Sequence, residues 1–182
     1  PVVALIALCG AVLMSLPAAA QLKIDITQGN LEPMPIAIPD FISDSSGGEK
    51  IGANIAEVIR ANLASSGLFK ALPPQSYIEK QTDIDFQPAF SDWRVIKAED
   101  LVSGRIVSEG AGRVRVEYRL WDVFGGKQLS ALRLATTPDN WRRIAHKVSD
   151  KIYEDLTGET GYFDSRIVFI DETGSKTNRR KR

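Results

Sequence analysis

Residues 101–136 carry the pattern that most restricts how this chain can fold. Three segments in this region are rich in strand-forming residues, and glycine-rich turns separate them. In the middle segment every second residue is apolar and the residues between are arginine or glutamate, as in a strand with one buried face. The turns are short enough to join antiparallel neighbours. We therefore predict an antiparallel meander with strands at about 101–109, 113–123 and 127–136.

Two amphipathic helices are predicted on either side of the meander, at about 49–65 and 138–157. In both segments apolar residues recur at the three- and four-residue spacing of a helix. Gly67 and Gly158 follow them, where a left-handed C-cap favours glycine. Weaker patterns predict strands at 34–41, 68–72 and 167–170, a helical turn at 76–80, a short helix at 93–98, and a turn at 171–174. Together these elements predict an α/β fold, with helices packed on a mixed sheet.

The N-terminus reads as a signal peptide. Residues 1–16 are uncharged and mostly apolar, and Pro17 and three alanines follow. This run is shorter than the roughly 20 residues that a membrane-spanning helix needs. Cys9 lies inside the run and not at its end, which argues against lipid attachment. We expect the chain to begin inside a signal peptide that is cleaved after Ala20, which places the mature protein outside the cytoplasm.

Composition narrows the possible functions further. The roughly 160 residues after the predicted cleavage site suffice for one domain with its own core. They contain no cysteine, so neither a disulfide nor thiol chemistry is expected. The net charge is zero, but residues 176–182 are basic, so the remainder is mildly acidic. Such a surface does not favour nucleic acid as a partner.

The segment that follows the predicted cleavage site, residues 21–33, alternates apolar and polar side chains before it reaches Gly29 and Pro33. Nothing else in the sequence ties it to the rest of the domain. It is predicted either to join the sheet or to form an arm that adds to the sheet edge of a partner.

No set of residues with the spacing of a catalytic or metal site is present. His146 is the single histidine and is predicted to lie on a solvated helix face. Gly47 and Gly48 precede a helix, but their surroundings match neither a dinucleotide-binding fingerprint nor a P-loop. Asp83 and Asp85 lack the spacing of a calcium loop. A small-ligand- or nucleotide-binding α/β domain using the Gly47-Gly48 loop stays open as an alternative, and a secreted hydrolase is the least supported reading.

The order of several sequence segments resembles the N-terminal domain of the TolB family. The matching segments are QLKIDITQG at 21–29, PIAIPDF at 35–41, IGANIAEVIRANLASSGLFKAL at 51–72, VEYRLWDVFGGKQL at 116–129 and IAHKVSDKIYEDLTGETGYFDSRIVFI at 144–170. The resemblance implies an α/β fold with a mixed five-stranded sheet and helices packed on it. It also implies a division into signal peptide (1–20), N-terminal arm (21–33), α/β domain (34–161), and linker with a truncated start of a β-propeller (162–182).

The resemblance further implies a periplasmic, non-enzymatic scaffold of the Tol-Pal system. Such a scaffold supports outer-membrane integrity and envelope constriction at cell division. A monomer is expected, with no cofactor, metal, nucleic acid or small-molecule substrate. Its propeller, which this chain stops short of, binds the lipoprotein Pal, and its arm binds the C-terminal domain of TolA. The arm positions that match are Gln21, Leu22, Lys23, Ile24, Asp25, Ile26, Thr27, Gln28 and Gly29.

Overall fold

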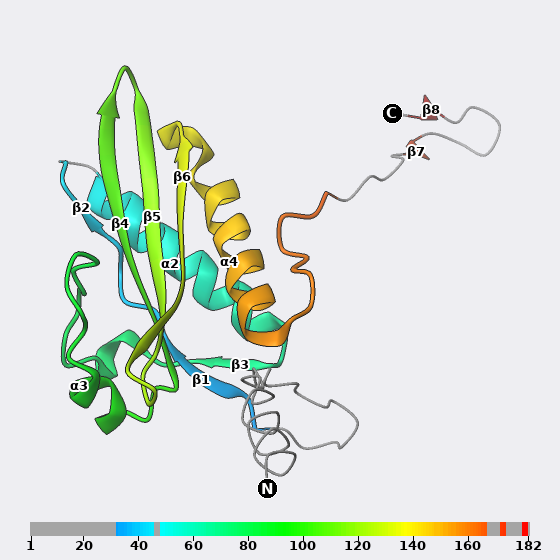
Figure 1. Ribbon diagram of the computed structural model, residues 1–182. Helices are drawn as coiled ribbons and strands as arrows, with labels where there is room; N and C mark the ends of the chain where they lie inside the picture. Colours follow the sequence, from blue (N-terminus) through cyan, green and yellow to red (C-terminus); the bar gives the residue numbers. More distant parts are fainter. Residues whose placement is uncertain (1–31, 46–47, 167–171, 174–179, 182) are drawn as a thin grey trace, which may run out of the picture.

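The computed structural model describes residues 32–45, 48–166, 172–173 and 180–181. The predicted signal peptide, the predicted arm residues 21–29 and the strand predicted at 167–170 lie outside the described residues. The main part of the described chain is a mixed sheet with two long helices on one face (Figure 1).

The predicted mixed five-stranded sheet with helices packed on it is confirmed. Its strands follow the order β3-β1-β4-β5-β6; β1 runs parallel to β3 and β4, and β4, β5 and β6 form the antiparallel meander. A sixth short strand, β2, also runs parallel to β4. The strands are β1 Met34–Ala37, β2 Ile42–Ser43, β3 Phe69–Ala71, β4 Asp100–Gly110, β5 Arg113–Asp122 and β6 Lys127–Thr136.

Helices α2 and α4 cover one face of this sheet and lie against each other (Figure 1). Val116 and Tyr118 of β5 point to this side and share a buried core with Ile59 of α2 and Ile152 of α4. Both long helices end at glycines with positive φ, as predicted. The helical elements are α2 Gly48–Ser65, α3 Phe90–Val95 and α4 Trp141–Thr157, with 3₁₀ turns η2 Pro74–Ser76 and η3 Pro138–Asn140.

The strand predicted at 34–41 is wrong in its extent. β1 ends at Ala37, and β2 begins only at Ile42. Pro39 lies between them and has no amide hydrogen to donate, which disfavours a continuous central strand there.

Phe41, beside this break, turns into the core, where it is 1% exposed. A Cβ added at Gly52 of α2 would collide with the Phe41 carbonyl oxygen. One added at Gly104 of β4 would collide with the Phe41 ring. These two glycines therefore allow helix and sheet to approach Phe41 closely.

Two other predicted elements are displaced. The helix predicted at 93–98 is α3, which starts earlier because the Phe90 ring packs against Trp121 at a centroid distance of 5.9 Å. Lys97 has a positive φ of 61°, so the helix cannot continue through 98. The helical turn predicted at 76–80 is instead η2, which begins at a proline.

Of the turn predicted at 171–174, the structure describes only Glu172 and Thr173, which form a strand of a short two-stranded ribbon. It consists of β7 (Glu172–Thr173), which pairs antiparallel with β8 (Arg180–Lys181). No helix in the described part of the chain has the length and apolarity that crossing a bilayer requires.

On the second face of the sheet, the loop that carries Ile84 and Asp85 lies over part of the charged side chains, and α3 covers one end. There Trp93 of α3 packs with Tyr77, Leu101 and Trp121 in a separate buried cluster. Farther along β4, β5 and β6, the side chains on this face are mostly charged and face away from α2 and α4. We call this region the open face; its central row is Arg105, Glu117 and Arg133.

Candidate functional site

The predicted arm joins the domain at its surface. Its last two residues, Glu32 and Pro33, are exposed. β1 then begins at Met34, whose amide donates a 2.9 Å hydrogen bond to the Leu68 carbonyl beside β3. The partner-binding residues predicted at 21–29 themselves lie outside the described residues, so their role stays a prediction.

The sequence pattern predicted a solvated helix face for His146. The structure does not place His146 on a fully solvated face. It is half-buried between α4 and α2, where its Nδ1 accepts a 2.9 Å hydrogen bond from the Asn62 amide. The same amide nitrogen donates to Ser149 Oγ at 2.9 Å, and that hydroxyl donates to the Ala145 carbonyl. The Ser149 hydroxyl and the His146 imidazole thus both contact Asn62 and link the two helices. They do not form the hydrogen bond of a nucleophile–base pair.

The other positions considered for chemistry have structural partners. Asp85 pairs with Arg105, and Asp83 accepts a hydrogen bond from the backbone amide of Asp85. A Cβ at Gly48 would collide with the Ser43 hydroxyl, so the space before α2 is already filled on that side. Among the described residues, no group of three His, Cys, Asp or Glu side chains is placed to hold a metal ion.

The charged side chains of the open face converge on Glu117, at the centre of β5. Glu117 is 3% exposed, and three arginines surround its carboxylate. Arg115 Nε approaches it at 2.7 Å, Arg105 Nη2 at 2.9 Å and Arg133 Nε at 3.3 Å. The strand register explains this convergence, because Arg105 and Arg133 are the cross-strand neighbours of Glu117 on both sides.

Glu117 is therefore an ionised carboxylate inside the sheet. Burial by itself raises the pKa of Glu117, but hydrogen bonds from Arg105 and Arg115, together with the charge of Arg133, outweigh it and lower the pKa overall. The same hydrogen bonds raise the pKa values of Arg105 and Arg115. The network fixes three arginine side chains on the part of this face that lies beyond α3.

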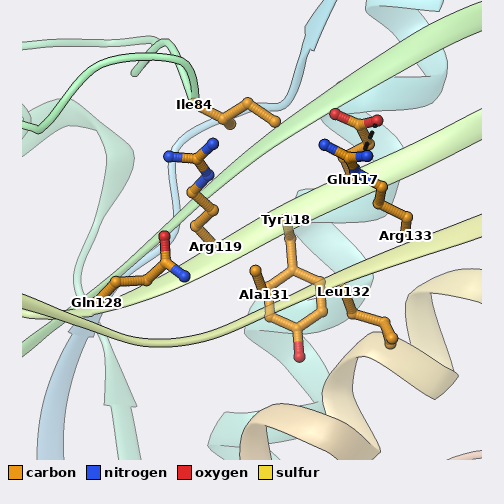
Figure 2. A pocket seen from close by; sticks show the side chains of 8 residues that line it. All are labelled: Ile84, Glu117, Tyr118, Arg119, Gln128, Ala131, Leu132 and Arg133. Carbon is orange, nitrogen blue, oxygen red and sulfur yellow. Dashed lines mark ion pairs between the residues drawn. The ribbon is translucent and has the colours of Figure 1, made fainter.

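A pocket of about 190 Å³ opens beside this network. Arg119, Gln128, Ala131 and Arg133 line it from β5 and β6, and Ile84 lies across it (Figure 2). The side chains of Tyr118 and Leu132 point to the opposite face, toward the helices. The pocket thus presents guanidinium and amide donors, which suit an anionic group.

Sequence reasoning did not find this site. The alternation predicts Arg115, Glu117 and Arg119 on one face of β5, opposite the face that it predicts to be buried. The missing information was the register, which brings Arg105 and Arg133 to Glu117 from the neighbouring strands. A glutamate between two arginines on one strand was the only signal in the sequence.

Comparisons with known proteins agree with this fold. The sequence model of the TolB amino-terminal domain matches residues 22–129. The Tol-Pal system protein TolB of Paramagnetospirillum magneticum is 50% identical over 167 residues, which are 92% of this chain and 37% of that protein. The chain therefore spans little more than a third of this relative.

Solved structures show the same similarity. The crystal structure of TolB from Acinetobacter baumannii matches with a TM-score of 0.64 and 28% identity, over 82% of this chain and 35% of that one. The hypothetical protein CT253 from Chlamydia trachomatis shares the fold, with a TM-score of 0.50 and 12% identity over 69% of this chain and 99% of that one. Because the family model matches more than half of the chain and the first relative is half identical, the chain belongs to the TolB family, as its amino-terminal domain.

Proposed function

We propose that this chain is a non-enzymatic periplasmic adaptor of the Tol-Pal system, whose N-terminal arm binds the C-terminal domain of TolA. The observation that carries the proposal is membership of the TolB family, whose 50% identical relative is a Tol-Pal system protein. The contacts described for His146, Asp83 and Asp85 are structural, which also favours an adaptor over an enzyme.

The proposed binding mode is the addition of a strand to a sheet of TolA. Extended peptides bind in this way through main-chain hydrogen bonds, and alternate side chains fill pockets and give specificity. The arm has the required alternation. Its apolar positions are Leu22, Ile24 and Ile26, and its polar positions are Lys23, Asp25 and Thr27.

The folded domain acts in this proposal as the anchor of the arm. β1 follows directly after it and is held on both sides, by β3 and by β4. A pull on the arm would therefore act on an interior strand of the sheet and not on a strand that peels from its edge. Anchoring of this kind suits a protein that links two others.

The proposal also includes wider roles, which it assigns to the whole protein and not to this domain alone. They are Pal binding by the β-propeller of the family, support of outer-membrane integrity and envelope constriction at division. No described residue of this chain is assigned to Pal, because the chain spans little more than a third of its relative.

Paired substitutions on the two sides of the arm test the binding mode. The probe is the purified C-terminal domain of TolA, and the protein is the chain from Gln21 onward. Ile24→Asp is expected to weaken binding at least about tenfold, because it places a charge in an apolar pocket. Thr27→Asp, the matched control on the other side, is expected to leave the Kd within about threefold. Equal effects of the two changes would contradict strand addition.

A further inference from the structure

The outer edge of the sheet beside the pocket is open. β6 pairs with β5 on one side, and no described strand pairs with its other side. It is 10 residues long, whereas proteins commonly keep exposed edge strands short. An antiparallel edge strand directs alternate N–H and C=O groups outward, where a strand of another chain can pair with them.

The charges of β6 discriminate between possible partner strands. Its two charged residues, Lys127 and Arg133, are both basic, and it contains no acid. Pairing with a second copy of β6 would bring two basic strands together, which is unfavourable. An extended segment with acidic side chains would instead meet opposite charges.

Arg119 lies on the open face and has no acidic partner among the described residues. Arg105 and Arg115 each contact two carboxylates, whereas the Arg119 guanidinium lies 6.0 Å from the centre of the Trp121 ring. Its cross-strand neighbours are the small residues Ser103 and Ala131, so the approach to Arg119 is not blocked from either strand.

Two further donors border the same pocket. Arg133 reaches Glu117 only at 3.3 Å, and its side chain is 73% exposed, so it can also turn to a ligand. Gln128 is exposed and directs its amide group toward the pocket (Figure 2). Glu117 also lines the pocket, but Arg105 and Arg115 contact its carboxylate closely and offset its charge. A carboxylate that enters here would therefore meet the guanidinium groups of Arg119 and Arg133 and the Gln128 amide, and Ile84 would contact its aliphatic stem.

We propose that β6 and the pocket of Arg119, Gln128 and Arg133 form a docking surface for an extended acidic segment of a partner protein. The segment adds as a further strand along β6, and one of its Asp or Glu side chains enters the pocket. This surface lies on the folded domain and is distinct from the arm proposed to bind TolA. It gives the domain a partner of its own, recognised by main-chain pairing and a carboxylate.

Peptide binding followed by NMR tests the proposal. The probe is an eight-residue peptide of alternating valine and glutamate, added to the isotope-labelled chain from Gln21 onward. The expected result is binding with shifts concentrated in Lys127–Thr136 and around Arg119. Arg119→Gln is expected to weaken it about tenfold, the loss expected for one charge-assisted contact.

Matched controls separate the two parts of the recognition. Arg142→Gln removes an arginine that also lies over a tryptophan, but on α4, and should leave binding unchanged. Replacing glutamate by lysine in the peptide, or methylating its backbone nitrogens, should abolish binding. Gln128→Ala provides a second pocket variant if Arg119→Gln lowers the melting temperature. Absence of binding at millimolar peptide, equal binding of the lysine peptide, or self-association of the chain through β6 would overturn the proposal.

Discussion

At the scale of single residues, two positions show how closely this fold constrains its side chains. Gly104 lies in β4, where its missing Cβ leaves room for the Phe41 ring. Glu117 lies in β5, where burial of a carboxylate depends on the arginines around it. Position 104 has no room for a side chain, and position 117 requires a negatively charged one.

Gly104→Ala is expected to destabilise the domain by about 1–3 kcal/mol, because the added methyl group overlaps the Phe41 ring in a filled core. Urea unfolding of the two proteins measures the difference. In a Phe41→Leu background the same change should cost less, since the smaller side chain leaves space. Equal losses of stability from Gly104→Ala in both backgrounds would contradict a close contact between residue 104 and the Phe41 ring.

Glu117→Gln is expected to lower the free energy of unfolding by about 1–3 kcal/mol at pH 7, because it leaves three arginines without their shared carboxylate. The pKa of Glu117 is lowered in the fold, so its ionised form contributes stability above the unfolded pKa near 4.5. This contribution is lost as pH falls through the lower folded value. The difference between the two proteins should therefore shrink at pH 3.5, and a constant difference would contradict the ion-pair network.

At the scale of elements, the start of β4 brings acidic groups together. Asp100 is 5% exposed and is the cross-strand neighbour of Asp122 at the end of β5. Burial raises the pKa of Asp100 to about 7, and the charges of Asp122 and Glu99 add to the rise. The strand ends are thus held together more strongly when Asp100 is protonated.

Asp100→Asn is expected to stabilise the domain more at pH 8 than at pH 5. The folded pKa is raised above the ordinary value of 3.8, so stability present at low pH is lost as pH rises through about 7. Asparagine carries no charge to bury, and the gain at pH 8 should be on the order of 2–4 kcal/mol. Thermal melting across this pH range measures it. The exposed Asp139→Asn is the control, and the same pH dependence in both variants would contradict the burial effect.

At the scale of the whole molecule, local patterns predicted the elements that carry their own signals. The period of two in β5, the helical spacing in α2 and α4, and the glycines after each helix specified those elements within one to three residues. The break at Pro39 and the start of α3 at Phe90 were missed, because they depend on where Phe41 and Trp121 pack. The arginine cluster around Glu117 was missed for the same reason, since it arises from the register of three strands.

The central claim, that residues 21–29 bind TolA, is tested most directly by isothermal titration with the C-terminal domain of TolA. Two proteins are compared, one that starts at Gln21 and one that starts at Asn30, with matching melting temperatures as evidence of an intact fold. The predicted result is binding by the first protein and none by the second. Equal binding by both would contradict an arm-mediated contact, and binding by neither would remove TolA as the partner of this chain.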